Sequence, residues 1–194
     1  MTPAQLISEA AQIGLQQKRA EISALVKFLL SKRRVNVLEI GSSLGGSFYL
    51  WCKLFSGKKI SLDDPSKNFG GIGIDRARKR NREFQRWSRN VYAILADSHS
   101  MRAYYRVARI LGNEKLDFLF IDGDHSFSGV QLDYFMYRDF VRSGGYIAFH
   151  DVTDASWPIT VGCLVSRFWS ELKGRKREFN SHQDWGGIGV LEVK

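Results

Sequence analysis

The chain has 194 residues, enough for one domain with a substantial buried core. Hydrophobic residues make up 44% and charged residues 25% of it, which is the balance of an ordinary globular protein. No apolar run approaches the roughly 20 residues of a membrane span, and the first residues lack the basic and apolar stretches of a secretory signal. The two cysteines, Cys52 and Cys163, are too few for a disulfide framework or a cysteine-rich zinc site. These features predict a cytoplasmic protein.

Much of the net charge of +9 lies in residues 76–89, which read RARKRNREFQRWSR. Such a stretch could contact phosphates, and Phe84 and Trp87 could stack on nucleic-acid bases. The alternative is a solvated helix face whose two aromatic side chains are anchored in the core. Charge by itself informs solubility and nonspecific binding rather than the reaction.

Short apolar runs alternate along the chain with helical patterns, which predicts a parallel sheet covered by helices on both faces. Residues 56–68 contain a glycine, a proline and two aspartates and are predicted to be a loop. Helices are expected near residues 22–29, 46–55 and 127–141, with a further one opened by Pro158. Strands are predicted at residues 35–40, 70–74, 91–96, 116–121, 146–149, 177–179 and 188–193.

Acidic residues follow the predicted strands at the point where each strand ends. Asp75, Asp97, Asp122 and Asp151 occupy such positions, and Glu39 lies within the first strand-to-helix turn. In an open parallel sheet, ligands bind beyond the carboxyl ends of the strands. One aspartate of this kind could be a helix cap, but four in succession predict a lined pocket.

The first turn reads EIGSSLGGS, from Glu39 to Ser47. Gly41 permits a sharp turn, and Gly45 with its neighbour permits a ligand to approach the backbone before a helix begins. The spacing differs from the G-x-G-x-x-G of dinucleotide proteins, and the lysine of a phosphate-binding P-loop is absent. An acidic residue before the first glycine suits an ammonium group, and Asp75 suits a ribose diol. A ligand with both groups is S-adenosylmethionine.

The segments LEIGSSLGGS, GIGID, LADS and FIDGDHSFSGVQLD, followed by GGYIAFHDV, resemble the class I methyltransferases. The resemblance is to the cephalosporin hydroxylase-like branch, which is related to the catechol-type O-methyltransferases, and it covers residues 35 to 152. It implies a Rossmann-like α/β fold, a three-layer sandwich around a mostly parallel seven-stranded sheet of order 3-2-1-4-5-7-6 with the last strand antiparallel. One methyltransferase domain is expected over 1–194, with an N-terminal helical extension at 1–34 and the core at 35–194.

The resemblance also implies which residues surround S-adenosylmethionine. Asp75 would hold the ribose hydroxyls, with Arg76 beside it in the cofactor site. Asp122 would border the same site. The remaining positions are those at the methionine part and at the adenine edge: Glu39, Gly41, Ser43, Gly45, Ser47, Asp97 and Ser98.

The O-methyltransferase relatives hold a divalent metal with acidic residues after strands four and five, and the matching positions here are Asp122, His150 and Asp151. Mg²⁺ is the expected ion for oxygen ligands, whereas His150 would favour another divalent metal. Asp124 could replace the third ligand. His125 lies where these relatives carry a lysine base, and an imidazole is well suited to accept a proton near neutral pH. The alternative is that His125 only caps the following helix.

These observations predict O-methylation of a small hydroxylated molecule, with Asp122 and His125 as catalytic residues. One alternative is a nucleic-acid methyltransferase that uses the basic segment 76–89. Another is a non-catalytic protein that binds S-adenosylmethionine. The short proline-containing motif of enzymes that methylate base amines is absent, because prolines occur only at positions 3, 65 and 158. A homo-oligomer is left open.

Overall fold

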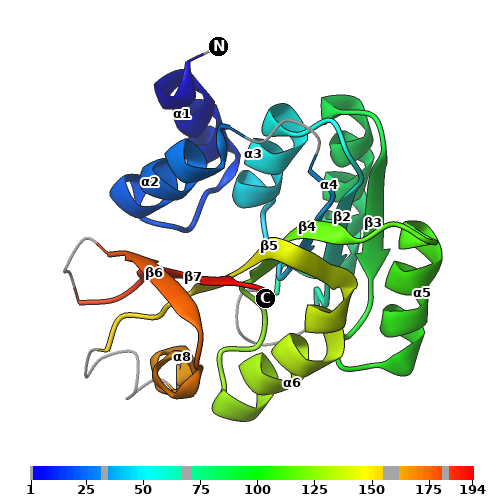
Figure 1. The fold of residues 1–194 in the computed structure, drawn as a ribbon. Helices are drawn as coiled ribbons and strands as arrows, with labels where there is room; N and C mark the ends of the chain where they lie inside the picture. The colour runs from blue at the N-terminus through cyan, green and yellow to red at the C-terminus, as the bar shows by residue number, and fades with distance from the viewer. Residues whose placement is uncertain (1, 32–34, 67–70, 155–161, 181–183) are drawn as a thin grey trace.

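A computed structural model describes residues 2–31, 35–66, 71–154, 162–180 and 184–194. Its centre is a seven-stranded sheet of order β3-β2-β1-β4-β5-β7-β6 (Figure 1), as expected. The strands β1 to β5 pair in parallel, and β7 is antiparallel to both β5 and β6. The strands are β1 Val37–Ile40, β2 Lys59–Asp63, β3 Val91–Leu95, β4 Leu116–Ile121, β5 Val141–His150, β6 Arg175–Phe179 and β7 Ile188–Glu192.

Helices cover both faces of the sheet and complete the predicted three-layer sandwich (Figure 1). Successive strand residues point to opposite faces. Val37 and Phe118 therefore pack with α1 to α4, whereas Leu38 and Leu119 pack with α5, α6 and α8. The helices are α1 Pro3–Ile13, α2 Arg19–Leu29, α3 Gly46–Leu54, α4 Ile74–Trp87, α5 Met101–Leu111, α6 Phe127–Tyr137, the 3₁₀ helix η1 Arg138–Phe140 and α8 Val165–Glu171.

The predicted strand at residues 70–74 is wrong, because the second strand is β2, inside the stretch that was predicted to be a loop. The polar positions of β2 obscured it, since Lys59 and Ser61 alternate with Ile60 and Leu62. All four side chains are buried, because β2 lies between β1 and β3 with helices on both faces. Alternating polar residues therefore did not indicate a solvent-exposed face here. The predicted strand ends at Ile74, the residue at which α4 begins.

The basic segment 76–89 lies mostly on α4. Of its two predicted forms, the structure shows the solvated helix face whose aromatic side chains are anchored. Phe84 is fully buried against Phe48, with ring centroids 4.6 Å apart, and Trp87 packs edge-on against Tyr49 at 5.0 Å. Phe84 belongs to the core and the partly buried Trp87 packs against it, so both rings are held by other aromatic side chains of the protein.

The N-terminal helix α1 packs against α3, and α2 packs against α1 and lies beside β6 and β7 (Figure 1). A capping box between Thr2 and Gln5 begins α1, and Tyr49 of α3 donates to Glu9 of α1 at 2.5 Å. Cys52 and Cys163 are both buried and not bonded to each other. The helix expected at Pro158 lies outside the described residues. Among the described helices, none has the length and apolar character to cross a membrane.

Candidate active site at the carboxyl end of the sheet

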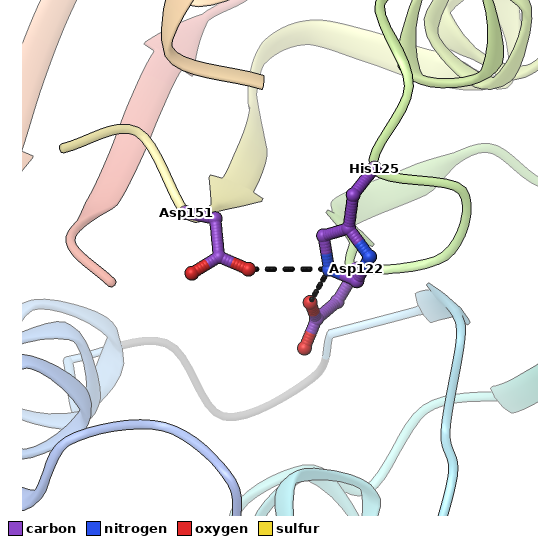
Figure 2. Close-up of side chains that lie close together, drawn as sticks. All are labelled: Asp122, His125 and Asp151. Atoms are coloured by element: carbon purple, nitrogen blue, oxygen red, sulfur yellow. Dashed lines mark hydrogen bonds and ion pairs between the residues drawn. The ribbon is translucent and has the colours of Figure 1, made fainter. Parts of the chain in front are cut away.

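Two aspartates and two histidines from the ends of β4 and β5 form one cluster. Nε2 of His125 lies 3.3 Å from Oδ1 of Asp122 and 3.1 Å from Oδ2 of Asp151 (Figure 2). Nδ1 of His150 lies 3.2 Å from each of the same two oxygens. Each imidazole therefore bridges the two carboxylates, because the parallel pairing of β4 with β5 brings their carboxyl ends side by side.

Local geometry directs His125 into this cluster rather than to the helix end. The N-cap of α6 is Ser126, whose hydroxyl accepts from the Gly129 amide at 3.0 Å. Asp124 accepts from the Ser126 amide at 2.9 Å and thereby holds the turn. Capping is thus performed by the neighbours of His125, and Asp124 serves the turn rather than the carboxylate cluster. Asp151 has a positive φ of 61°, a conformation that costs free energy in a residue with a side chain.

Hydrogen bonds and opposite charges within the cluster together outweigh the effect of burial on its protonation. Burial lowers the pKa of His125, but hydrogen bonds and charge from Asp122 and Asp151 outweigh it and raise that pKa to about 9. The same two carboxylates raise the pKa of His150 well above its usual value despite complete burial. Burial alone would raise the pKa of each carboxyl, yet both pKa values are lowered by the two imidazoles. At neutral pH both histidines therefore carry a proton that neutralises the carboxylates.

The cluster contains a donor set that fits a divalent cation. Asp122, His125 and Asp151 each offer one ligand atom, and these atoms lie within 4.8 Å of one another. His150 was the expected imidazole ligand, but this three-residue group contains His125 instead. His150 is fully buried, and its Nε2 has no hydrogen-bond partner among the described residues. All four residues were predicted at metal or base positions, but the bridging of both carboxylates by each imidazole was not foreseen.

The glycine loop after β1 lies directly against the loop after β4. Gly41 has φ +85°, and a Cβ atom there would lie 2.0 Å from the carbonyl oxygen of Asp122. Gly45 and Gly46 also permit a close approach to the backbone, but the atoms that approach them belong to the protein and not to a ligand. A Cβ at Gly45 would meet Phe84 at 2.6 Å, and one at Gly46 would meet the Leu15 amide nitrogen at 2.3 Å.

Glu39 lies beneath this loop and is fully buried. Its two oxygens accept hydrogen bonds from Ser47 at 2.7 Å and from Trp51 at 2.5 Å. Burial raises the pKa of Glu39 to about 8, against the opposing effect of the Ser47 hydrogen bond. Both oxygens are thus occupied by side chains of α3, so Glu39 fixes the helix that follows the glycine loop.

Asp63, the last residue of β2, holds the same loop in place and was missed by sequence reasoning. Its Oδ1 accepts from the amides of Ser42 at 3.1 Å and Ser43 at 3.3 Å. Its Oδ2 pairs with Arg80 at 2.8 Å, and Arg80 also donates to the carbonyl of Ser43. The sequence offered a signal for this pair, namely an aspartate at a strand end followed by an arginine on the inner face of the next helix. The signal could not be used, because the second strand was predicted at residues 70–74.

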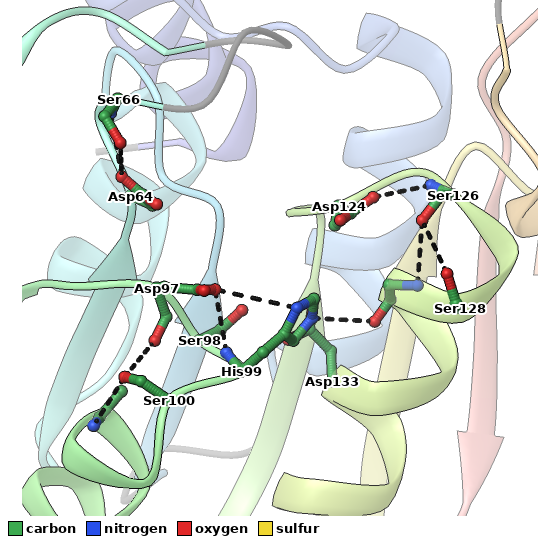
Figure 3. Close-up of polar contacts among 12 residues, drawn as sticks. Asp64, Ser66, Asp97, Ser98, His99, Ser100, Asp124, Ser126, Ser128 and Asp133 are labelled. Atoms are coloured by element: carbon green, nitrogen blue, oxygen red, sulfur yellow. Dashed lines mark hydrogen bonds and ion pairs between the residues drawn. The ribbon is translucent and has the colours of Figure 1, made fainter.

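Asp75 and Arg76 lie in the first turn of α4 rather than at a strand end, which corrects their predicted position. The Asp75 side chain is 93% exposed and pairs with Arg78 at 3.5 Å, and Arg76 is exposed. The carboxylate that directly follows β2 is Asp64, which accepts from the amide of Ser66 at 3.0 Å (Figure 3). The physical reason for assigning a ribose contact to Asp75 is therefore lost.

Asp97 and Ser98 follow β3 as predicted, and a partly buried network holds them. Asp97 accepts from the amide of His99 at 3.1 Å, and the Ser98 carbonyl accepts from Tyr137 at 2.7 Å. The His99 ring lies between Asp97 and the buried Asp133, with Nε2 3.3 Å from the Asp133 carboxylate (Figure 3). The hydrogen bond to Asp133 raises the pKa of His99, whereas burial raises the pKa of Asp133. This network connects the loop after β3 to α6.

Comparisons with known proteins identify the family of the chain. Residues 38–152 match the model of a methyltransferase domain family, Methyltransf_24. The chain is 32% identical over 152 residues to an uncharacterized protein of Acanthamoeba polyphaga mimivirus. That match covers 75% of this chain and 64% of the viral protein, so the chain spans less than two thirds of that relative.

Solved structures show the same fold at low identity. The O-methyltransferase from Bacillus cereus, in complex with SAH, superposes with a TM-score of 0.65 and 16% identity, covering 98% of this chain and 91% of that one. MycE, from the mycinamycin biosynthetic pathway, was solved with Mg, SAH and mycinamycin VI. It superposes with a TM-score of 0.64 and 19% identity, covering 99% of this chain and 53% of that one. Because the family match spans more than half of the chain, this protein belongs to the methyltransferase domain family Methyltransf_24.

Proposed function

We propose that this protein is an S-adenosylmethionine-dependent O-methyltransferase whose acceptor is a small hydroxylated molecule, such as a sugar or a secondary metabolite. The observation that carries the proposal is the convergence of Asp122, His125 and Asp151 beside the glycine loop. Methyl transfer is an in-line displacement, so positioning and deprotonation of the acceptor are most of what a protein can supply.

The protonation of the cluster determines how it could assist that deprotonation. With a pKa of about 9, His125 holds a proton at neutral pH and cannot accept one from an acceptor hydroxyl. In this protonation state, deprotonation of the acceptor would instead require a cation that compensates the charges of Asp122 and Asp151. A bound divalent cation would supply that charge and lower the pKa of an acceptor hydroxyl next to it. Asp122, His125 and Asp151 would hold it, and His150 would position the two carboxylates.

The mixed donor set bears on which ion is preferred. Oxygen-only sites suit Mg²⁺, whereas an imidazole nitrogen shifts preference toward transition metals such as Mn²⁺ or Zn²⁺. Because His125 contributes a nitrogen between two carboxylates, we expect tighter binding of Mn²⁺ than of Mg²⁺.

For the cofactor, we propose that the glycine loop from Gly41 to Ser47 receives the methionine part. Asp97 and Ser98 would take the adenine edge, supported by their fixed position after β3. Asp64, in place of Asp75, would hold the ribose hydroxyls. It directly follows the buried strand β2 and is only partly exposed. In parallel sheets this is the place where an acidic residue meets a ribose diol.

Replacing Asp64 with alanine is expected to weaken binding of S-adenosylhomocysteine roughly 10- to 100-fold, because hydrogen bonds to a charged group are lost. Asp75→Ala is the matched control and should bind like the wild type, since its side chain is 93% exposed. Calorimetric titration of the three proteins, with EDTA and with Mn²⁺, measures both effects. A loss confined to Asp75→Ala would reverse the assignment, and a wild type that binds no cofactor would refute the proposed function.

A nucleic-acid acceptor is the second candidate, favoured by the exposed basic side chains of α4 and α5, two helices on opposite faces of the sheet. Exposed cationic side chains on these two helices are Arg76, Arg78, Lys79, Arg82, Arg86, Arg102, Arg106 and Arg109. We expect weak RNA binding, lost more than about tenfold between roughly 50 and 200 mM salt, with no methyl transfer. Fluorescence anisotropy on wild type, Arg82→Glu and the control Lys27→Glu on α2 measures the binding. Methylated RNA in a labelled-cofactor assay would instead establish the second candidate.

A further inference from the structure

The linker between α1 and α2, residues 14–18, is inserted between the glycine loop and the turn before β7. Gly14 and Leu15 pack against the glycine loop. A Cβ at Gly14 would meet Leu44 at 2.6 Å, and one at Gly46 would meet the Leu15 amide nitrogen at 2.3 Å. On the other side, Lys18 donates to the Trp185 carbonyl, and its ammonium lies 4.6 Å from the centroid of that ring. The linker is therefore held from both sides.

Gln17 in this linker directs its side chain toward the loop after β4. The residue is only 6% exposed, and its Nε2 donates to Oδ2 of Asp122 at 2.6 Å. The carboxylate fixes the orientation of the amide, because the flipped amide would place an oxygen against it. The Oε1 atom of Gln17 is consequently committed to the other side, where it is buried without a hydrogen-bond partner among the described residues.

A buried amide oxygen without a partner is costly, so its presence indicates that a donor arrives with a ligand. The surroundings identify the kind of donor. Gln17 lies where the glycine loop meets the Asp122 loop, and the nearest side-chain charge is the Asp122 carboxylate that it contacts. An acceptor oxygen beside a carboxylate suits a cation with several N–H groups, and it disfavours a ligand carboxylate.

We propose that Gln17 is a specificity-determining residue that accepts a hydrogen bond through Oε1 from the ammonium group of the amino-acid part of the cofactor. This inference rests on the proposed function, because it takes S-adenosylmethionine as the ligand. Nε2 of the same side chain orients Asp122, so one residue of the α1–α2 linker would connect the cofactor to the catalytic cluster.

The test compares ligands that share the thioether nucleoside and differ in the amino-acid part. S-adenosylhomocysteine carries the ammonium and the carboxylate, its decarboxylated analogue retains only the amine, and 5′-methylthioadenosine has neither. We expect Gln17→Ala to weaken the first two about tenfold or more and to leave 5′-methylthioadenosine within about twofold. Gln16→Ala, at the exposed neighbour, is the matched control and should bind all three like the wild type.

Calorimetry in EDTA measures these affinities without any contribution from a metal. Gln17→Met retains the volume of the side chain and replaces Gln17→Ala if thermal melts show that the alanine variant is unfolded. An equal loss for all three ligands would overturn the proposal, because it would mean that Gln17 only supports the loop. Unchanged binding of S-adenosylhomocysteine would also overturn it. A wild type that binds none of the three would instead refute the proposed function.

Discussion

Replacing Asp122 with asparagine is expected to lower the free energy of unfolding by about 3–5 kcal/mol near pH 6, the cost of removing one partner from a buried ion pair. In the folded protein the imidazoles of His125 and His150 each contact Asp122 and Asp151. Without Asp122, two buried imidazolium groups would share one carboxylate. The pKa of at least one histidine should therefore fall, which NMR titration of the imidazole protons can follow.

The pH dependence of this deficit follows from the direction of each pKa shift. The pKa of His125 is raised to about 9, so its contribution to stability is complete below about pH 6.5 and is lost as the pH rises through about 9. The pKa values of Asp122 and Asp151 are lowered, so their contribution is present above about pH 4 and is lost as the pH falls further. The deficit should be largest between these limits.

Guanidinium unfolding of wild type and Asp122→Asn from pH 5 to pH 10 measures this profile. Asp75→Asn, the same substitution at a side chain that is 93% exposed, is the matched control and should remain within about 0.5 kcal/mol of the wild type. A deficit that stays constant from pH 6 to pH 10 would contradict the proposed charge pairing.

Gly41→Ala is expected to destabilise the protein by roughly 3–5 kcal/mol, because strain and a backbone clash add together. Gly41 has φ +85°, and the new Cβ would lie 2.0 Å from the carbonyl oxygen of Asp122. Relief of that contact requires the glycine loop and the loop after β4 to separate. We therefore expect binding of S-adenosylhomocysteine to be lost as well.

Gly73→Ala separates the two contributions. Gly73 has a similar φ of +80°, but a Cβ there would meet no atom of the described residues within 4 Å. It should cost only about 1–3 kcal/mol, which is the cost of a sparsely populated backbone conformation alone. Guanidinium unfolding of both variants gives the difference. If Gly41→Ala is no more costly than Gly73→Ala, the two loops are not in the contact that the structure shows.

Much of the fold could be predicted from local patterns. The strands β3 and β4 are short apolar runs bounded by polar residues, and their predicted limits agree with the structure to within one residue. The strand β2 was missed because Lys59 and Ser61 are polar residues with buried side chains. Prediction from sequence patterns assumes that polar residues are exposed. This assumption is wrong in the interior of a parallel sheet, where both faces of a strand are covered.

The candidate site could also be predicted only in part, because local patterns show where a strand ends but not which side chains meet there. Asp122 and Asp151 could be assigned because each follows a strand directly, and parallel strands end at one edge of the sheet. The protonation of His125 could not be predicted, because it depends on carboxylates from two different strands. The pair formed by Asp63 and Arg80 was missed together with β2.

The sequence by itself determined the glycine loop and the strand-end carboxylates Asp97, Asp122 and Asp151, since each of these depends on neighbouring residues and on one periodicity. The order of the sheet was implied by the family resemblance. Only the tertiary structure decided which groups meet. Gln17 and Asp122 are 105 positions apart, and their hydrogen bond exists because the α1–α2 linker packs against the glycine loop. Charge and hydrogen bonding act over a few ångströms in space, so the pKa of a site residue and the partner of a buried amide are properties of the folded chain.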